Sequence, residues 1–197
     1  MSKKAQYNFF AYMARMKLIR RWGLMRSVNE ENIAEHSLQV AQIAHALALI
    51  KNKKFGGTLN VDRIATIALY HETSEVITGD LPTPIKYYNS DIRNSYKDIE
   101  RAANMKLLEK LPEEFRADYY EIIEVDSNSY EYKLVKAADK ISAYVKTVEE
   151  MQLGNREFAM AERTLGEDVW HMADEMEEVA YFCENYLDSF KKTLDEL

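Results

Sequence analysis

Four side chains with metal-binding groups fall on predicted helices: His36, His71, Glu72 and Asp139. His36, His71 and Asp139 each lie four residues from an aliphatic residue, so they share the core-facing side of their helices. Glu72 follows His71 directly and is turned by about 100° around the predicted helix. Burying imidazoles and carboxylates without partners costs free energy, whereas a shared divalent cation satisfies all of them. The four residues therefore predict one metal site.

The chemistry of these ligands narrows the choice of metal. Imidazole and carboxylate groups suit one divalent transition metal of the Mn, Fe, Co, Ni or Zn class. A single buried histidine is more often a hydrogen-bonded core residue, so the prediction depends on the combination from three helices. His45 and His171 lack such company, and we interpret them as structural or surface residues.

The elements that must position these residues are helices. Only 6 Gly and 3 Pro occur in 197 residues, which is too little turn punctuation for an all-β fold. The segment 79–84 cannot continue a helix, because its prolines lack backbone donors. No repeat or linker is evident, so we expect one domain spanning 1–197. Apolar periodicity predicts helices at about 7–19, 33–50, 60–77, 91–110, 112–125 and 131–151, with one or two more after 156.

Charge and composition exclude several classes of function. The net charge of −7 argues against a nucleic-acid binder, which needs a basic surface for phosphates. A metal and an arginine can still make a small pocket locally positive. The single cysteine, Cys183, excludes an intrachain disulfide. No apolar run reaches the roughly 18 residues of a membrane span and no secretory signal is evident, so we expect a cytoplasmic protein.

The motifs around the ligands resemble a known family. The order His, His-acid, Asp resembles the metal-binding pattern of HD-domain phosphohydrolases. The closer resemblance is to YfbR-type 5′-deoxynucleotidases, and the Thr-Gly-Asp-Leu-Pro-Thr-Pro sequence at 78–84 carries it most specifically. It extends over nearly the whole chain, through Arg-Trp-Gly-Leu-Met-Arg at 21–26, Glu-His-Ser-Leu-Gln-Val at 35–40, the remainder of 74–87, and Leu-Val-Lys-Ala-Ala-Asp at 134–139. The resemblance implies an all-α, compact multi-helix HD-domain fold, a divalent metal, a homodimer and hydrolysis of (deoxy)ribonucleoside 5′-monophosphates.

Four further residues receive roles within this resemblance, although each type also occurs as an ordinary surface, turn or core residue. Glu75 lies four residues after His71 on the same predicted helix face, so we assign it general-base or water-orienting work. Arg21 is expected to neutralise charge on the phosphoryl oxygens, with Trp22 as a wall of the nucleoside pocket. Asp80 is expected to contact a sugar hydroxyl or to protonate the leaving oxygen.

One position departs from the family pattern. The second motif is ordinarily His-Asp, and this chain has His71-Glu72, which keeps the carboxylate but adds a methylene. Two alternatives therefore stay open. One is an HD-type hydrolase of other nucleotides, although Val76 after Glu75 does not fit the alarmone branch, which carries a further acidic pair. The other is a non-catalytic helical binding module with a structural metal, which does not need Arg21, Glu75 or Asp80.

The C-terminal region contains several aromatic residues that must pack against something. We expect part of this region to be buried in the homodimer interface, including Tyr181, Phe182, Tyr186 and Phe190.

Overall fold

The computed structural model describes residues 7–86 and 88–197, and Tyr87 of the 74–87 motif lies outside the described residues. Apart from one isolated antiparallel bridge between Arg20 and Asn32, the described residues contain no β-structure, which confirms the all-α prediction. The described helices are α1 (Phe9–Met13), η1 (Met16–Leu18), α2 (Ile33–Lys54), α3 (Val61–Tyr70), α4 (Glu75–Thr78), α5 (Thr83–Lys86), α6 (Ser90–Leu108), α7 (Glu113–Ile123), α8 (Tyr130–Gln152), η2 (Arg156–Phe158), α9 (Ala159–Glu175), α10 (Glu177–Tyr186), η3 (Leu187–Lys191) and η4 (Leu194–Glu196).

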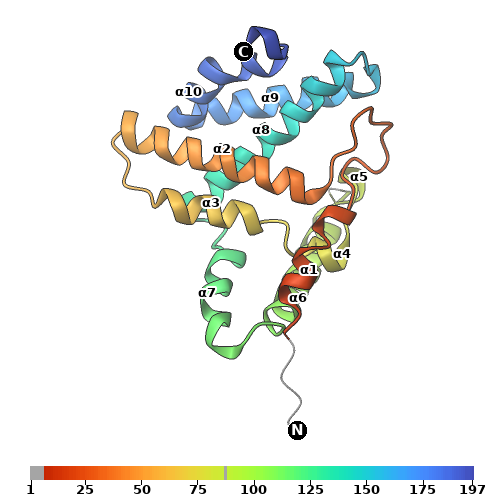
Figure 1. Ribbon diagram of the computed structural model, residues 1–197, viewed down its shortest axis with the longest axis vertical. Helices are drawn as coiled ribbons and strands as arrows, with labels where there is room; N and C mark the ends of the chain where they lie inside the picture. Colours follow the sequence, from red (N-terminus) through yellow and green to blue (C-terminus); the bar gives the residue numbers. More distant parts are fainter. Residues whose placement is uncertain (1–6, 87) are drawn as a thin grey trace.

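The larger hydrophobic core lies between α2, α3, α8, α9 and α10. In Figure 1, α9 and α10 cover the side of α2 and α8 that faces away from α6 and α7. Within α2, Val40, Ile43 and Leu47 are buried at helical spacing, with His36 one turn earlier on the same face. The predicted core-facing position of His36 is therefore confirmed.

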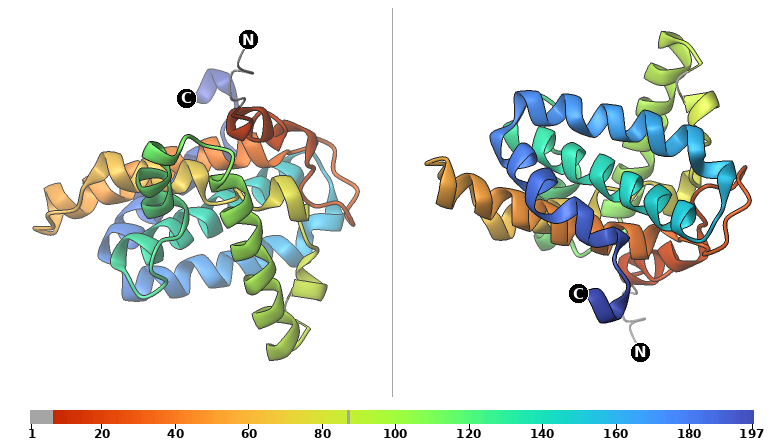
Figure 2. Two further views of the ribbon diagram at one scale, coloured as in Figure 1. Left: turned by 90° about the horizontal axis from the view of Figure 1, so that it is seen from below. Right: turned by 90° about the horizontal axis from the view of Figure 1, so that it is seen from above.

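A smaller core packs α1 against α6 and α7 around Phe9, Leu107, Leu108 and Leu111. In both views of Figure 2, α6 extends beyond the body formed by the larger helices. The chain passes between the two cores where Tyr70 and Val76 pack on the smaller one. The segment that carries His71, Glu72 and Glu75 thus lies at their junction.

Two predicted helices are shorter than expected. The 7–19 segment forms α1 and the separate 3₁₀ turn η1 instead of one amphipathic helix. The 60–77 prediction is wrong between 71 and 74, because α3 ends at Tyr70 and the chain forms turns before α4. The Thr73 hydroxyl donates to the Tyr70 carbonyl at 2.6 Å, and this local bond competes with continued helix.

The other predicted helices are present in the structure. The 33–50, 91–110, 112–125 and 131–151 segments are helical near the predicted bounds, and two helices plus short 3₁₀ turns follow 156. The proline-containing segment 79–84 leaves the helix after Gly79, and only the single turn α5 begins at Thr83. Helices able to cross a membrane, being both long and apolar, are not found in the described part of the chain.

Candidate metal centre and active site

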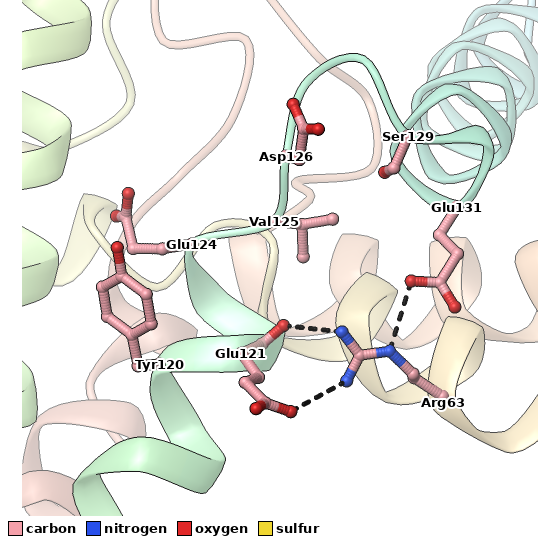
Figure 3. A pocket seen from close by; sticks show the side chains of 8 residues that line it. All are labelled: Arg63, Tyr120, Glu121, Glu124, Val125, Asp126, Ser129 and Glu131. Carbon is pink, nitrogen blue, oxygen red and sulfur yellow. Dashed lines mark hydrogen bonds and ion pairs between the residues drawn. The ribbon is translucent and has the colours of Figure 1, made fainter.

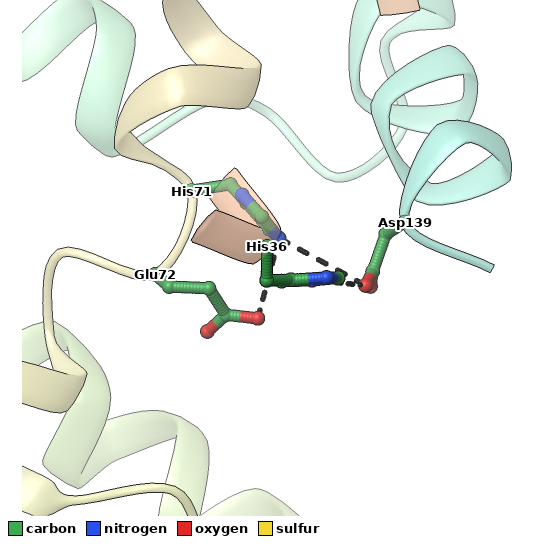
Figure 4. A group of neighbouring side chains, drawn as sticks. All are labelled: His36, His71, Glu72 and Asp139. Atoms are coloured by element: carbon green, nitrogen blue, oxygen red, sulfur yellow. Dashed lines mark hydrogen bonds and ion pairs between the residues drawn. The ribbon is translucent and has the colours of Figure 1, made fainter. Parts of the chain in front are cut away.

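Three separate segments bring the four predicted ligands together. His36 lies near the start of α2, His71 and Glu72 follow α3, and Asp139 lies within α8. One ligand atom from each residue lies within 4.8 Å of the others. Figure 4 shows the four side chains converging from their different elements. The arrangement is the one that a single ion requires.

The α2 end of the site is held by a helix cap. The side-chain oxygen of Asn32 accepts hydrogen bonds from the backbone N–H groups of Ala34 and Glu35. Glu35 reaches back to the backbone N–H of Asn32, which completes a capping box. Because the helix begins at Ile33, His36 lies in its first turn, and its ring contacts Ser142 and Asp139 of α8.

His71 presents a free, buried nitrogen to the cluster. Its Nδ1–H donates to the Ala68 carbonyl at 2.7 Å, which leaves Nε2 as the nitrogen with a lone pair. Nε2 is buried and has no hydrogen-bond partner among the described residues. It lies 3.2 Å from Glu72 Oε1 and 3.9 Å from Asp139 Oδ1. A lone pair facing two carboxylates is satisfied by a cation, so these residues fit a divalent metal.

His36 supports the same conclusion through its second nitrogen. The Ser142 hydroxyl donates to Gln39 Oε1 at 2.6 Å, so it accepts from His36 Nδ1–H at 3.1 Å. This chain directs the Nε2 lone pair toward Asp139 Oδ1, only 3.0 Å away. Two electron-rich atoms at that distance need positive charge beside them. Burial lowers the pKa of His36, which opposes its carrying that charge as a proton.

The carboxylates draw positive charge into the site. Burial by itself lowers the pKa of His71, yet the carboxylates of Glu72 and Asp139 raise it to about 9. Burial likewise opposes ionisation of Glu72, but the neighbouring His71 holds its pKa well below the usual range. The pKa of Asp139 is also lowered, against burial, by Lys136 and both histidines. Ionised carboxylates and neutral imidazoles are the forms that bind metal, so a bound ion would displace the proton that the raised pKa lets His71 keep.

Arg21 enters the site from the segment between η1 and α2. Its Nη1 lies 4.0 Å from Glu72 Oε1, and its Nε donates to Glu31 Oε2 at 3.0 Å. Burial opposes its charge, but the surrounding carboxylates, Asp139 first, raise its pKa further. Trp22 beside it packs on the Phe158 ring, with 5.4 Å between ring centroids. The structure therefore brings Arg21 to the edge of the four candidate metal-binding side chains. The neighbouring Trp22 ring is packed against Phe158.

Glu75 reaches the same region by a route that the sequence did not predict. It does not share a helix with His71, because the turns at 71–74 separate α3 from α4. Glu75 is almost completely buried. Burial, together with the carboxylates of Glu72 and Asp80, raises its pKa to about 10. Glu75 is thus protonated near neutral pH until positive charge enters the site.

Asp80 lies just after α4, beyond Gly79, whose φ of 74° is in the left-handed region that favours glycine. Burial raises the pKa of the Asp80 carboxyl, and the Arg21 charge opposes that shift. Asp80 therefore belongs to the electrostatic environment of Arg21, Glu72 and Glu75. His45 and His171 are both exposed, as expected for residues outside the site.

Two residues near the site were not found from the sequence. Lys136 Nζ donates to Asp139 Oδ2 at 3.1 Å, on the oxygen opposite the one that faces the histidines. Its position three residues before Asp139 on α8 was the available signal. Glu31 was interpreted only as part of a helix start, yet its carboxylate accepts from Arg21 and from the Trp22 indole. Nothing in its sequence spacing predicts that contact.

A recess of about 250 Å³ lies elsewhere, between α3, α7 and the start of α8, and none of the candidate site residues lines it. Figure 3 shows Arg63 bound there by Glu121 and Glu131. Because this cation is already paired, the recess offers no free positive charge for a phosphate. The recess is therefore separate from the cluster around His36 and His71.

Comparison with known proteins identifies the family. The family model described as 5′-deoxynucleotidase YfbR-like matches residues 8–190. The chain belongs to this YfbR-like family. A 5′-deoxynucleotidase of Vibrio cholerae is 56% identical over 191 residues, covering 96% of this chain and 97% of that protein. The family resemblance expected from the sequence motifs is therefore confirmed.

Solved structures confirm the expected HD-domain fold. An HD-domain phosphohydrolase from Listeria innocua matches with a TM-score of 0.81 and 24% identity, over 93% of this chain and 88% of that one. A cyanophage S-2L HD phosphohydrolase, solved with dA and one catalytic Zn²⁺ ion, matches with a TM-score of 0.65 and 20% identity, over 96% of this chain and 100% of that one. At these identities, the two structures establish the fold alone.

Proposed function

We propose that this chain is a metal-dependent 5′-nucleotidase that hydrolyses nucleoside 5′-monophosphates, including deoxynucleotides, to nucleoside and phosphate. The observation that carries the proposal is the convergence of His36, His71, Glu72 and Asp139 beside a buried arginine. Membership of the YfbR-like family and the 5′-deoxynucleotidase of Vibrio cholerae support the same substrate class. We further propose that 1–197 forms one phosphohydrolase domain, with the site at the junction of its two cores.

His36 Nε2, His71 Nε2 and one oxygen each of Glu72 and Asp139 hold the metal in this proposal. A divalent transition metal supplies Lewis-acid polarisation of a phosphate oxygen and lowers the pKa of water. Ser142 fixes the orientation of the His36 ring, and the Ala68 carbonyl fixes that of His71. Lys136 holds the free oxygen of Asp139. The choice among Mn, Fe, Co, Ni and Zn depends on affinity and supply in the cell.

Arg21 and Glu75 act directly on the reacting phosphate. The guanidinium of Arg21 neutralises charge on the phosphoryl oxygens, since its Nη1 reaches the edge of the cluster. Glu75 orients the attacking water and accepts its proton once added positive charge has lowered the raised pKa. Its burial keeps the carboxyl away from bulk water, which preserves that orientation.

Asp80 and Trp22 recognise the nucleoside side of the substrate. The Asp80 carboxyl, with its raised pKa, contacts a sugar hydroxyl or delivers a proton to the leaving 5′ oxygen. Trp22 forms part of the wall against the nucleoside, with Phe158 behind it. Trp22 follows Arg21 directly in the chain, and Asp80 lies close enough for the Arg21 charge to lower its pKa, so both residues lie near the proposed phosphate-binding arginine.

We also propose that the enzyme works in the cytoplasm as a homodimer. The reducing cytoplasm suits its single buried cysteine, Cys183. The aromatic residues expected at the interface mostly pack on the larger core of their own chain, including Phe182, Tyr181 and Phe190. Tyr186 is 45% exposed, which leaves it as the one of these four suited to a partner surface.

A phosphate-release screen tests the proposed function. Purified protein is assayed with nucleoside mono-, di- and triphosphates in their ribo and deoxy forms, each with Mn, Co, Ni or Zn. We expect release from 5′-monophosphates and loss of release in the His71→Ala, Asp139→Ala double variant. The His45→Ala variant, on an exposed position of α2, is the matched control and retains activity. Activity confined to triphosphates, or absent with every metal, would reject the proposal.

A further inference from the structure

The carboxylate of Glu31 joins two residues of the proposed substrate site. Its Oε2 atom accepts from Arg21 Nε at 3.0 Å and from the Trp22 indole Nε1 at 2.9 Å. Only 12% of the Glu31 side chain is exposed, and 13% of the Arg21 side chain. Hydrogen bonds to a charged acceptor in such partly buried surroundings are stronger than neutral ones. One oxygen therefore holds a cation and an aromatic ring at the same time.

The backbone holds Glu31 directly opposite Arg21. The Arg21 N–H donates to the Glu31 carbonyl at 2.9 Å, and the Ile33 N–H donates to the Ile19 carbonyl at 3.0 Å. An antiparallel bridge pairs Arg20 with Asn32 between these bonds. The pairing closes the loop 22–30 at its base. Residues ten apart in sequence are thereby placed side by side before any side chain contributes.

Trp22 adopts a conformation that needs support. Its φ is 58°, and it is the one non-glycine residue with positive φ among those described. For a bulky side chain the left-handed region costs about 1–2 kcal/mol. The indole bond to Glu31 and the tilted packing against the Phe158 ring offset that cost. Backbone strain of this kind persists where the surrounding structure over-determines it, typically at functional sites.

Removal of the Glu31 charge also changes where Arg21 binds. Among the described residues, Glu72 is the other carboxylate within ion-pair distance of the Arg21 guanidinium, at 4.0 Å from Nη1. Without Glu31, the carboxylate of Glu72, a proposed metal ligand, would be the remaining partner for the Arg21 guanidinium and would compete with a phosphate for it. Glu31 prevents this by holding Nε and leaving the Nη groups free to face the site.

We propose that Glu31 is a positioning residue that couples phosphate binding by Arg21 to nucleoside binding by Trp22. This inference rests on the proposed function for those two residues. A displacement of Arg21 or Trp22 caused in this way lowers catalytic efficiency without removing the metal ligands. Because a misplacement of about 1 Å can cost about 100-fold in rate, we expect a 10- to 100-fold loss in kcat/KM.

The test compares Glu31→Gln with Glu30→Gln in a Trp170→Phe background. Glu30 is the adjacent, exposed glutamate, bound to Arg20 at 2.6 Å, and provides a matched control. Trp170 is 48% exposed on α9, and its replacement leaves Trp22 as the single fluorophore of its type. We expect Glu31→Gln to shift Trp22 emission, raise KM and lower kcat, with metal content unchanged. Glu30→Gln should match its parent in all four measurements.

A double-mutant cycle with Trp22→Phe tests the coupling itself. Phenylalanine lacks the indole N–H, so Glu31→Gln then disturbs Arg21 alone and should cause a smaller loss than in the parent. Glu31→Asp keeps the charge but retracts it by one methylene, so its loss in kcat/KM should be smaller than that of Glu31→Gln. If Glu31→Gln misfolds, Glu31→Asp takes its place in the cycle. Additive effects, or equal behaviour of the Glu31 and Glu30 variants, would overturn the coupling. If the parent protein has no nucleotidase activity but Glu31→Gln still shifts the Trp22 emission, only the proposed function is rejected.

Discussion

Glu72 is the position at which this chain departs from the His-Asp motif, and its variants separate charge from length. In the structure, Glu72 Oε1 lies 3.2 Å from His71 Nε2, so the longer side chain already reaches the ligand cluster. Glu72→Gln keeps the length and removes the charge. Glu72→Asp keeps the charge and retracts the carboxylate by about 1.5 Å, the length of one carbon–carbon bond. Glu72→Ala removes both.

The structure sets the expected magnitudes. The Glu72 side chain is only 13% exposed, so its bond to a cation counts among the stronger, charged interactions of about 1.5–3 kcal/mol. Loss of about 3 kcal/mol weakens metal binding about 100-fold, which is the expectation for Glu72→Gln and the minimum for Glu72→Ala. Metal–ligand distances tolerate about 0.2 Å, so Glu72→Asp requires a compensating shift.

The position of Glu72 makes that shift possible. It lies in the turns between α3 and α4, where a small backbone movement breaks no regular helix. We therefore expect Glu72→Asp to bind metal within about tenfold of the parent, a loss of about 1.4 kcal/mol or less. Its turnover of deoxynucleoside 5′-monophosphates should equal or exceed that of the parent, because it restores the family motif. Glu72→Ala should lose most activity.

Calorimetric titration of the metal-free proteins with Mn²⁺ or Co²⁺ measures the affinities, and steady-state kinetics in the same metal measures turnover. Glu175→Gln, an exposed glutamate on α9, controls for the loss of one negative charge. Metal affinity and turnover of Glu72→Gln and Glu72→Ala equal to those of the parent would show that Glu72 is a bystander, and the ligand assignment at this position would be refuted.

Three further predictions follow from the same structure. His36→Ala should lose bound metal, as measured by elemental analysis. The control His45→Ala, on the exposed side of the same helix, should keep its metal. Equal metal contents in the two variants would exclude His36 as a ligand. Glu150 is buried, and although burial opposes its charge, bonds from Lys146 and from the Val28 and Asn29 backbone lower its pKa to about 2. Because its pKa is lower in the folded state, ionised Glu150 stabilises the fold above pH 4.5, and this stabilisation is lost as the pH falls toward 2. Glu150→Gln should therefore lower the free energy of unfolding by about 3 kcal/mol at pH 7, and by progressively less between pH 4.5 and 2, as measured by denaturant unfolding. A difference between the two proteins that does not change with pH would contradict the mechanism. Light scattering at micromolar concentration should give the mass of a homodimer, and a monomer throughout would reject that proposal.

The positions of two proposed ligands, His36 and Asp139, were predictable because helical periodicity relates spacing directly to direction. Val40, Ile43 and His36 occur at intervals of three and four, and the structure buries all three on one face of α2. The same periodicity predicted the core-facing side of α8 around Asp139 and Ser142. The motif at 78–84 supplied the family, which the matches along the chain confirm. Local chemistry and a repeating geometry thus carried these predictions.

Periodicity failed where local hydrogen bonds interrupted it. The apolar pattern continues past Tyr70, so the sequence predicted one helix to Ile77, but Thr73 bonds back to the Tyr70 carbonyl and the chain turns. Glu75 consequently reaches the site from a separate short helix, with its carboxyl buried. A side chain that competes with the backbone for one carbonyl leaves no trace in a hydrophobic pattern.

The sequence by itself determined the all-α class, and it indicated the four proposed ligands and the helical faces on which His36 and Asp139 lie, since these faces depend on residues three or four apart. Only the tertiary structure decided that Glu31 holds Arg21 and Trp22, that Lys136 binds the outer oxygen of Asp139, and that His71 keeps a free Nε2. Those contacts depend on the closing of a loop, on the choice of side-chain conformers and on the packing of α2 against α8. The Glu31 contacts join residues nine and ten apart, and no helical spacing encodes them. Lys136 and His71 each meet their partner three residues away, and there the choice of side-chain conformer decides the contact.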